Sequence, residues 1–446
     1  MTKPHLPPGP RDHLLRGGSL LEHARDQLGF LQRMAQEYGD IAYFRLGFDH
    51  CALINHPDLI EDALVKRAEE LREPQLMIEA ERVIGKVLLT AEGELHRQQR
   101  RILQHSFMRD KITSYAPAMI RHAARTRDRW TTGAHLDVAH EMMGLMLGIA
   151  SQTLFGIDIE DSTDEFSAAF NEAAWYVGLM SYLPHGGLLD HIPLPSTNRF
   201  HRARARLHAA AAAIIAERRR TGRHAGDLLS DLLHAHEGGG PTADVDVENE
   251  VLAILMAGHE TTARGITWAW YALSQNSDVE KLFHAELDSV LGAREPTVAD
   301  VPRLRYTEMV FAEAIRLFPP IFSIERQTKG DYPIRDYVLP AGSTLILSPF
   351  VTQRTPTWYP EPTKFDPQRM SPEARAARPS YSFFSFGGGQ RKCLGEPFAW
   401  TEAVLVLATL GQRWRLRLTP GTMVIPEPMM TLRPRDGLPM IAEART

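Results

Sequence analysis

The sequence predicts one large domain that is mainly α-helical and has a small β region. Long segments with helical periodicity dominate the 446 residues, and strand-like stretches are few and short. The chain shows no internal repeat of about 20–50 residues and no flexible interdomain linker, so we expect residues 1–446 to form a single unit. Hydrophobic residues make up 43% of the chain, which is enough to bury a large core.

Each element follows from local signals of period, turn residues and helix breakers. In chain order, the expected helices are Pro57–Glu70, Glu92–Ser106, Ile112–Trp130, His135–Phe155, Phe166–Tyr182, Arg199–Arg220, Val247–Gln275, Asp278–Leu291, Tyr306–Leu317 and Gly395–Gln412. The expected strands are Ile41–Phe44, Cys51–Ile54, Ser343–Leu347 and Trp414–Leu418. Loops are expected at Pro184–Pro195, Gly238–Asp246 and Thr355–Ser382, and the Pro-rich residues 1–15 are expected to be extended.

Charge and cysteine content exclude several classes of protein. The net charge is −5, whereas a dedicated nucleic-acid binder would carry a basic excess. Two cysteines cannot build a disulfide scaffold or a four-cysteine metal site, and such scarcity suits a reducing cytoplasm. No stretch of about 18 apolar residues is present, so we expect no membrane anchor.

The sharpest motif surrounds the second cysteine, in Ser385-Phe-Gly-Gly-Gly-Gln-Arg-Lys-Cys-Leu-Gly395. Glycines let the backbone approach a flat ligand closely and adopt positive φ angles. The segment leads into an apolar helix, where nearby N–H groups favour a thiolate over a thiol. Arg391 adds a charge that can pair with an anionic ligand edge. We therefore interpret Cys393 as a metal ligand.

A second motif, Ala257-Gly-His-Glu-Thr-Thr262, lies within the expected helix Val247–Gln275. Small residues recur there at every fourth position, which leaves one helix face shallow enough for a flat ligand. Glu260 and Thr261 lie beside that face and could relay protons through water. The same small residues are equally compatible with simple helix–helix packing.

Two further patterns pair charges at helical spacing. Glu313 and Arg316 share one helix face in apolar surroundings, which favours a buried, hydrogen-bonded ion pair. His96 and Arg100, four residues apart, can face one anionic group, although an ordinary basic helix face has the same pattern.

Taken together, these motifs resemble those of the cytochrome P450 superfamily, the haem-thiolate monooxygenases. Its cysteine pattern Phe-x-x-Gly-x-Arg-x-Cys-x-Gly is filled by Phe386, Gly389, Arg391, Cys393 and Gly395. Its oxygen-binding helix motif matches at all six positions from Ala257 to Thr262. Its Glu-x-x-Arg motif matches Glu313 and Arg316, and the third partner from its Phe-x-Pro-x-Arg segment matches Arg369.

The resemblance implies the family's fold around a buried haem b, with Cys393 as the iron ligand. It implies that Thr261 and Glu260 manage protons and that Glu313, Arg316 and Arg369 support the haem pocket. His96 and Arg100 match a propionate-binding helix with histidine in place of the commoner tryptophan, and Arg326 resembles a strand arginine that contacts a propionate. The full set of expected haem contacts is His96, Arg100, Ala257, Arg326, Phe386, Arg391 and Gly395.

The implied reaction inserts one atom of O2 into a lipophilic molecule such as a terpenoid, fatty acid or polyketide. The segments expected to line the substrate cavity are Leu76–Ile78, Val83–Leu89 and Trp175–Leu183, all rich in apolar residues. Without a Gly-x-Gly-x-x-Gly fingerprint, the chain is expected to receive electrons from a separate ferredoxin or flavodoxin with its NAD(P)H reductase. We expect a cytoplasmic monomer that binds no nucleic acid. The alternatives are a peroxide-driven or isomerase-type P450, a Cys-dependent hydrolase, and a non-enzymatic helical scaffold.

Overall fold

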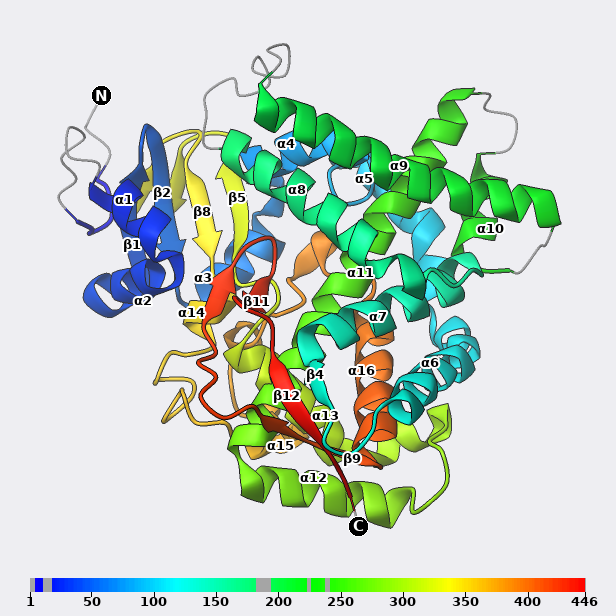
Figure 1. Cartoon of the computed structure of the whole chain (residues 1–446). Helices are drawn as coiled ribbons and strands as arrows, with labels where there is room; N and C mark the ends of the chain where they lie inside the picture. Colours follow the sequence, from blue (N-terminus) through cyan, green and yellow to red (C-terminus); the bar gives the residue numbers. More distant parts are fainter. Residues whose placement is uncertain (1–4, 11–17, 182–193, 223–225, 237–240, 446) are drawn as a thin grey trace. The chain divides into compact units, whose positions relative to one another are not determined.

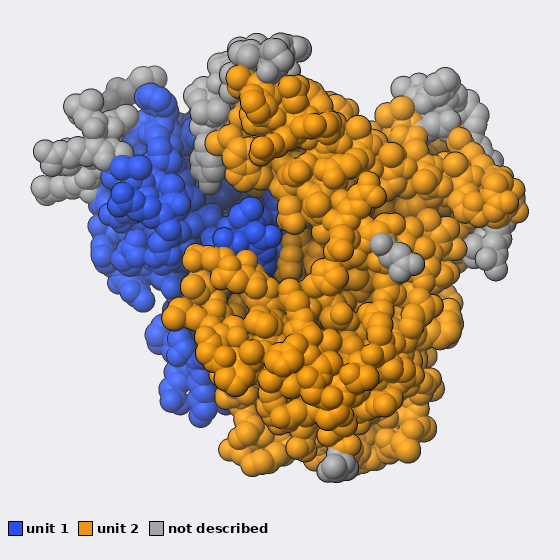
Figure 2. Space-filling model, viewed as in Figure 1, with its two compact units in different colours: residues 1–74, 312–393, 426–433 blue, residues 75–311, 394–425, 434–446 orange. Residues whose placement is uncertain are grey.

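Helices dominate the computed structural model, which describes residues 5–10, 18–181, 194–222, 226–236 and 241–445 (Figure 1). The prediction of a mainly α fold with a small β region is confirmed. The chain forms two compact units, each assembled from separate stretches (Figure 2). Unit 1 comprises Met1–Pro74, Ala312–Cys393 and Pro426–Arg433, and unit 2 comprises Gln75–Phe311, Leu394–Ile425 and Pro434–Thr446. One domain over residues 1–446 stays a prediction.

Unit 1 is built on a five-stranded sheet in the order β1-β2-β8-β5-β3. Its strands are β1 (Ile41–Leu46), β2 (Asp49–Ile54), β8 (Thr344–Leu347), β5 (Ile324–Thr328) and β3 (Leu71–Arg72). β2 and β8 are parallel, whereas β1–β2, β5–β8 and β3–β5 are antiparallel. Because side chains alternate along a strand, β2 directs Cys51 and Leu53 into one apolar cluster and Ala52 and Ile54 into another. Both faces of the sheet are therefore covered by core.

The remaining elements of unit 1 are short. They are α1 (Gly18–Arg25), α2 (Gln27–Tyr38), α3 (Pro57–Glu61), α14 (Pro349–Thr352), α15 (Pro372–Ala376), β6 (Tyr332–Ile334), β7 (Tyr337–Leu339) and β10 (Pro426–Pro428), together with β11 (Leu432–Pro434), whose last residue belongs to unit 2. The N-terminal segment is described only at residues 5–10, which contain no helix, and there the amide of Tyr43 donates to the carbonyl of Pro8 at 2.8 Å.

Unit 2 is mostly helical. Its helices are α4 (Gln75–Ile84), α5 (Gly93–Leu103), α6 (Arg109–Arg129), α7 (Val138–Phe155), α8 (Thr163–Ser181), α9 (Pro195–Thr221), α10 (Leu228–Ala235), α11 (Pro241–Gln275), α12 (Ser277–Val290) and α16 (Glu396–Gly411). A further helix, α13 (Arg305–Leu317), begins in unit 2 and ends in unit 1. A small sheet in the order β4-β12-β9 joins His135–Asp137, Pro439–Ala444 and Trp414–Leu418.

The long helix α11 forms the centre of unit 2. It packs against α7, α9 and α16, and it carries the fully buried Trp268 and Trp270. α8 and α9 lie side by side in the same unit (Figure 1). None of the described helices is both long enough and apolar enough to cross a bilayer.

The structure corrects several predicted boundaries, and the expected loop Thr355–Ser382 contains the short helix α15 (Pro372–Ala376). The expected helix Pro57–Glu70 ends at Glu61 and continues as a widened π-type turn, Asp62–Lys66, because this turn packs against the Gly389–Arg391 turn of the cysteine loop. The expected helix His135–Phe155 starts only at Val138, since its first three residues pair with β12 as strand β4.

The third correction concerns the expected loop Gly238–Asp246. α11 already begins at Pro241, where proline suits the first turn of a helix. The preceding residues 237–240 lie outside the described residues, as do Tyr182 and most of the expected loop Pro184–Pro195.

Candidate active site

The loop that leads to Cys393 needs glycine at three consecutive positions. Gly387 and Gly389 have φ angles of +71° and +63°, which disfavour other residues. A Cβ atom on Gly389 would lie 2.0 Å from the carbonyl oxygen of Leu64, and one on Gly388 would lie 2.5 Å from the ring of Tyr381. The loop belongs to unit 1, and at Gly389 its backbone packs against the backbone of Leu64.

A hydrogen bond closes this loop next to the start of α16. The amide of Cys393 donates to the carbonyl of Phe386 at 2.9 Å, which places both ends of the motif together. Gly395 is the N-cap residue of α16, so Cys393 lies just ahead of the positive end of the helix dipole. The Cys393 side chain is exposed.

The second cysteine has the opposite environment. Cys51 is 3% exposed within the apolar cluster on one face of the unit 1 sheet. Burial, reinforced by the charges of Glu325 and Asp49, raises the pKa of its thiol far above the usual range. Because metal ligation needs a thiolate, Cys393 is the thiol suited to bind a metal, and Cys51 packs as a small hydrophobe.

Two of the predicted haem-contacting arginines converge in unit 1. Arg391 Nε lies 2.8 Å from one carboxylate oxygen of Glu73, and Arg326 Nη1 lies 3.4 Å from the other. Glu73 is only 6% exposed, so these two guanidinium groups hold a buried anion between them. Glu73 was not predicted from the sequence, since nothing in the local pattern distinguishes it from neighbouring acidic residues.

The predicted buried ion pair is present at the end of α13. Glu313 and Arg316 are fully buried, with Nε–Oε2 and Nη2–Oε1 distances of 2.6 and 2.7 Å. Arg316 also donates to three backbone carbonyls, and Arg369 Nε lies 3.9 Å from Glu313 Oε1. The structure therefore brings together all three residues of the expected triad.

A buried amide that was not predicted from the sequence extends this network toward the cysteine loop. Gln353 donates to the carbonyls of Ile315 and Arg316 at 3.3 and 3.1 Å. Its own carbonyl oxygen accepts from the amide of Phe384 at 3.1 Å and lies 3.0 Å from the hydroxyl of Ser385. Gln353 thereby connects the end of α13 to the start of the loop that ends at Cys393.

In unit 2, α5 presents His96 and Arg100 on one face. His96 is buried and Arg100 is half-buried one turn later, while Arg97 and Arg101 are exposed. Arg97 is occupied at the surface by Glu94, whose carboxylate lies 2.7 Å from Nη2. The inner face of α5, with His96 and Arg100, is therefore distinct from its solvated basic face, and the binding of one anionic group by these two residues stays a prediction.

The small-residue stripe of α11 is open only in its middle. Ala253, Gly265 and Ala269 are buried, whereas Ala257 is exposed and Thr261 is half-buried. The Thr261 hydroxyl donates to the carbonyl of Ala257 at 2.9 Å. Helix packing thus accounts for both ends of the stripe, and its accessible part contains Ala257, a predicted haem contact, and Thr261, a predicted proton-handling residue.

Glu260, the acidic residue next to Thr261, forms an ion pair with Arg264. Its side chain is 5% exposed and lies 3.2 Å from Nη2 of Arg264, one turn later on α11. This partner was not predicted from the sequence, although the spacing of four between an acid and an arginine is a recognisable signal. Glu402, a fully buried acid on the mostly apolar α16, was not predicted either, and burial raises its pKa well above the usual range.

Comparison with known proteins agrees with these motifs. The family model of cytochrome P450 matches residues 7–439. Cyclooctatin synthase from Streptomyces melanosporofaciens is 37% identical, over 96% of this chain and 94% of that protein. Cyclooctat-9-en-7-ol 5-monooxygenase from the same organism is 35% identical over 92% and 89%, and pentalenene oxygenase from Streptomyces avermitilis is 31% identical over 96% and 95%.

The family match spans nearly the whole chain, and these relatives are matched over most of their own length. The chain therefore belongs to the cytochrome P450 family of haem-thiolate monooxygenases.

Proposed function

We propose that Cys393 holds haem b and that the loaded enzyme inserts one atom of O2 into a cyclic terpenoid. The carrying observation is the glycine loop, which presents an exposed cysteine ahead of a helix N-terminus. When bound, haem with a thiolate ligand supplies the activation of dioxygen. Membership of the family excludes the hydrolase and scaffold alternatives.

The residues around the loop fit an anionic cofactor. Arg391 and Arg326 already hold one carboxylate between them, which supports a role for both in binding a propionate. His96 and Arg100 on the inner face of α5 are proposed for propionate binding from unit 2. For contact with the ring itself we propose Phe386, Gly395 and Ala257, because these residues match positions of the family's cysteine and helix motifs.

Thr261 is the proposed direct proton-handling group, and Glu260 is its proposed relay partner. The Thr261 hydroxyl donates a hydrogen bond to the carbonyl of Ala257, so its oxygen can accept a hydrogen bond from water. Because Arg264 holds Glu260, the relay requires this carboxylate to exchange its partner. We expect Thr261→Ala to consume reductant while releasing peroxide in place of product, and Thr261→Ser to stay coupled. Full coupling in Thr261→Ala would contradict the assigned role.

Two observations support a terpenoid substrate. The relatives are named for oxidations of cyclooctat-9-en-7-ol and pentalenene. In unit 2, the segments expected to line the substrate cavity expose large apolar side chains, with Ile78, Leu89, Trp175 and Leu179 between 41% and 53% exposed. A panel of terpenoids, fatty acids and small polar compounds, scored by the haem spin-state shift, tests this assignment. Response to the polar compounds alone would refute it.

We also propose a cytoplasmic monomer whose single domain spans residues 1–446. Electrons would come from a ferredoxin or flavodoxin with its NAD(P)H reductase, because the chain carries no dinucleotide-binding fingerprint of its own. The retained acid–threonine pair favours this route over the peroxide-driven or isomerase alternative.

The absorption spectrum of the reduced, carbon-monoxide-bound protein tests the central assignment. We expect a strongly red-shifted Soret band in wild type and in Cys51→Ser, since Cys51 is a core residue. Cys393→Ser should lose this band. A band that survives Cys393→Ser, or disappears in a folded Cys51→Ser, would show that the wrong cysteine was chosen.

A further inference from the structure

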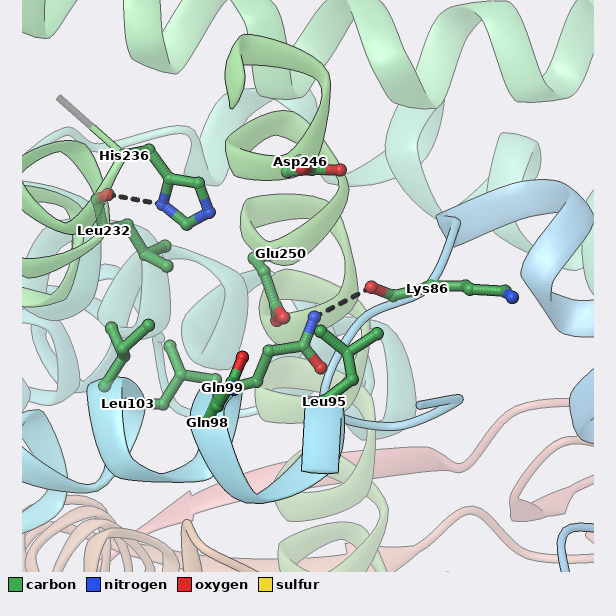
Figure 3. Close-up of a pocket in the computed structure, with 10 residues that line it drawn as sticks. Lys86, Leu95, Gln98, Gln99, Leu103, Leu232, His236, Asp246 and Glu250 are labelled. Atoms are coloured by element: carbon green, nitrogen blue, oxygen red, sulfur yellow. Dashed lines mark hydrogen bonds between the residues drawn. The ribbon is translucent and has the colours of Figure 1, made fainter. Parts of the chain in front are cut away.

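Figure 3 shows a cavity of about 210 Å³ in unit 2, between α5, α10 and α11. Glu250 Oε1 accepts from the amide of Leu88 at 3.0 Å, and burial raises the pKa of this carboxyl to about 7. Its other oxygen and Oε1 of Gln99 are buried beneath the cavity surface, so a ligand inside the cavity could not donate to them. A pocket in unit 1 has charged groups that a ligand can reach.

The unit 1 pocket is formed by the end of α15 and the segment that follows it to Phe383. Its polar lining includes Arg375, Arg378 and Ser380, and its apolar lining includes Pro379 and Phe383. No acidic residue is found among the described residues that line it. Its volume is about 310 Å³, and since a cavity of about 150 Å³ can hold benzene, it has room for a small organic anion.

The two arginines of this pocket carry charges that no carboxylate balances. Within the described part of the chain, the side chains of Arg375 and Arg378 form no ion pair, whereas Arg369 lies 3.9 Å from both Glu313 and Asp366. Arg375 is exposed and Arg378 is half-buried, so the charge of Arg378 is only partly hydrated. Two like charges that line one pocket repel each other, and an anion bound between them would offset this repulsion.

Aromatic rings restrict both guanidinium groups. Cζ of Arg375 lies 5.5 Å from the ring centre of Phe383, and Cζ of Arg378 lies 4.6 Å from that of Tyr359. Arg378 Nη2 also donates to the carbonyl of Arg369 at 2.6 Å, and its Nε is buried, so Nη1 is the nitrogen that it can offer to a ligand. Side chains that are already restricted lose less freedom on binding, which favours affinity.

We propose that this pocket binds a phosphate monoester in its dianionic form. The guanidinium of Arg375, Nη1 of Arg378 and the hydroxyl of Ser380 would donate to the phosphate oxygens, and the organic group would lie against Pro379 and Phe383. Arginine suits this task because its charge-assisted hydrogen bonds to phosphate are strong and directional. A bare halide would leave the apolar residues and most of the volume without a partner.

A bound phosphate should also stabilise the surroundings of the buried ion pair on α13. Arg378 donates to the backbone of Arg369, the third residue of that triad, and the ring of Tyr359 lies 4.9 Å from Cζ of Arg316. A ligand that fixes Arg378 therefore acts next to residues that support the fold. The site does not depend on the oxidation chemistry proposed above.

Isothermal titration of the holoenzyme with disodium phenyl phosphate at pH 8 and constant ionic strength tests the proposal. The second pKa of a phosphate monoester is about 6, so the ligand is a dianion at this pH. We expect one equivalent to bind. Arg375→Gln should weaken binding about ten- to a hundredfold, because it removes a charged donor group. The Arg375 side chain makes no hydrogen bond to another described residue, so this variant should fold as wild type does.

Arg25→Gln is the matched control and should bind as wild type does. Arg25 is also an exposed arginine in the last turn of a short unit 1 helix, but it does not line the pocket. Phe383→Leu should weaken binding of phenyl phosphate more than binding of inorganic phosphate, which has no organic group. An equal loss for both ligands would refute the apolar contact.

Thermal unfolding gives an independent readout. Phenyl phosphate should raise the melting temperature of wild type and of Arg25→Gln, and it should raise that of Arg375→Gln much less, because a ligand stabilises the folded state in proportion to its occupancy. The Soret band should not move, since the ligand does not reach the haem iron. Equal affinity in Arg375→Gln and wild type, an equal loss in Arg25→Gln, or binding that shifts the Soret band would overturn the proposal.

Discussion

Replacing Arg316 by lysine tests whether the buried ion pair of unit 1 supports the fold. All five N–H groups of Arg316 have acceptors: both carboxylate oxygens of Glu313 and the carbonyls of Gln353, Pro362 and Lys364. Lysine keeps the charge but offers only three donors on one atom, so at least two buried acceptors lose their partner.

Each acceptor left without a donor costs about 1–3 kcal/mol, which gives about 2–6 kcal/mol for two. Breaking a buried ion pair by removal of one partner costs about 3–5 kcal/mol, within the same range. We therefore expect Arg316→Lys to lower the free energy of unfolding by about 3–5 kcal/mol, which is a large part of the stability of an ordinary domain. Urea unfolding followed by far-ultraviolet circular dichroism measures this loss.

Two matched variants extend the prediction to an order of stability losses among three substitutions. Arg369 donates one hydrogen bond, from Nη2 to the carbonyl of Glu361 at 3.2 Å, so Arg369→Lys should cost about 1 kcal/mol. Arg97 pairs with Glu94 at the same spacing of three, but both side chains are more than half exposed, so Arg97→Lys should have no measurable effect. If Arg316→Lys unfolds at the same urea concentration as Arg97→Lys, the reasoning is wrong. If Arg316→Lys yields no soluble protein, the reasoning is still tested by whether Arg369→Lys loses more stability than Arg97→Lys.

Three further predictions concern a buried acid, a loop glycine and the α11 ion pair. The pKa of Glu250 is 4.5 in the unfolded chain and about 7 in the folded protein, so the folded state binds more protons between these pH values. Stability therefore falls as pH rises, by about 3 kcal/mol at pH 8. Urea unfolding at pH 5 and pH 8 should show that Glu250→Gln removes this loss of stability. If the stability of the variant depends on pH as that of wild type does, the raised pKa of Glu250 is contradicted. Gly389→Ala should lower the melting temperature more than Gly39→Ala. Both glycines have a positive φ, but an added Cβ would lie 2.0 Å from backbone at Gly389 and would have nothing within 4 Å at Gly39. Equal losses of melting temperature would refute this prediction. Glu260→Gln should cost about 3–5 kcal/mol in urea unfolding, because it removes a buried counter-charge from Arg264, and a loss below about 1 kcal/mol would show that the pair is not a stabilising one.

Features whose chemistry and spacing are local could be predicted from the sequence. The Glu313–Arg316 pair and the glycine loop before Cys393 follow from residues only a few positions apart, and the structure has both. The predicted strands were also found, since alternation and turn residues define them. The short helices α1, α2, α4 and α10 were missed, because helices of a few turns give a weak periodic signal and depend on tertiary packing.

Partners that are distant in the sequence could not be predicted. Glu73 pairs with arginines from β5 and the cysteine loop, more than 250 positions away, and no local pattern marks it. The break in the expected helix Pro57–Glu70 has the same origin, because the turn after Glu61 is shaped by contact with the Gly389–Arg391 turn. Such features depend on which segments the fold places together.

The two strongest motifs of unit 1 are joined by a residue that belongs to neither. Carbonyls at the end of a helix lack partners within it, and Gln353 supplies donors to two of them, on Ile315 and Arg316. The same amide accepts from Phe384, at the start of the loop that ends at Cys393. Arg316 in turn donates to the backbone carbonyl of Gln353 at 2.7 Å, so the ion pair orients the residue that anchors the loop. The buried charges about eighty positions before Cys393 are therefore linked through Gln353 to the loop that carries this cysteine.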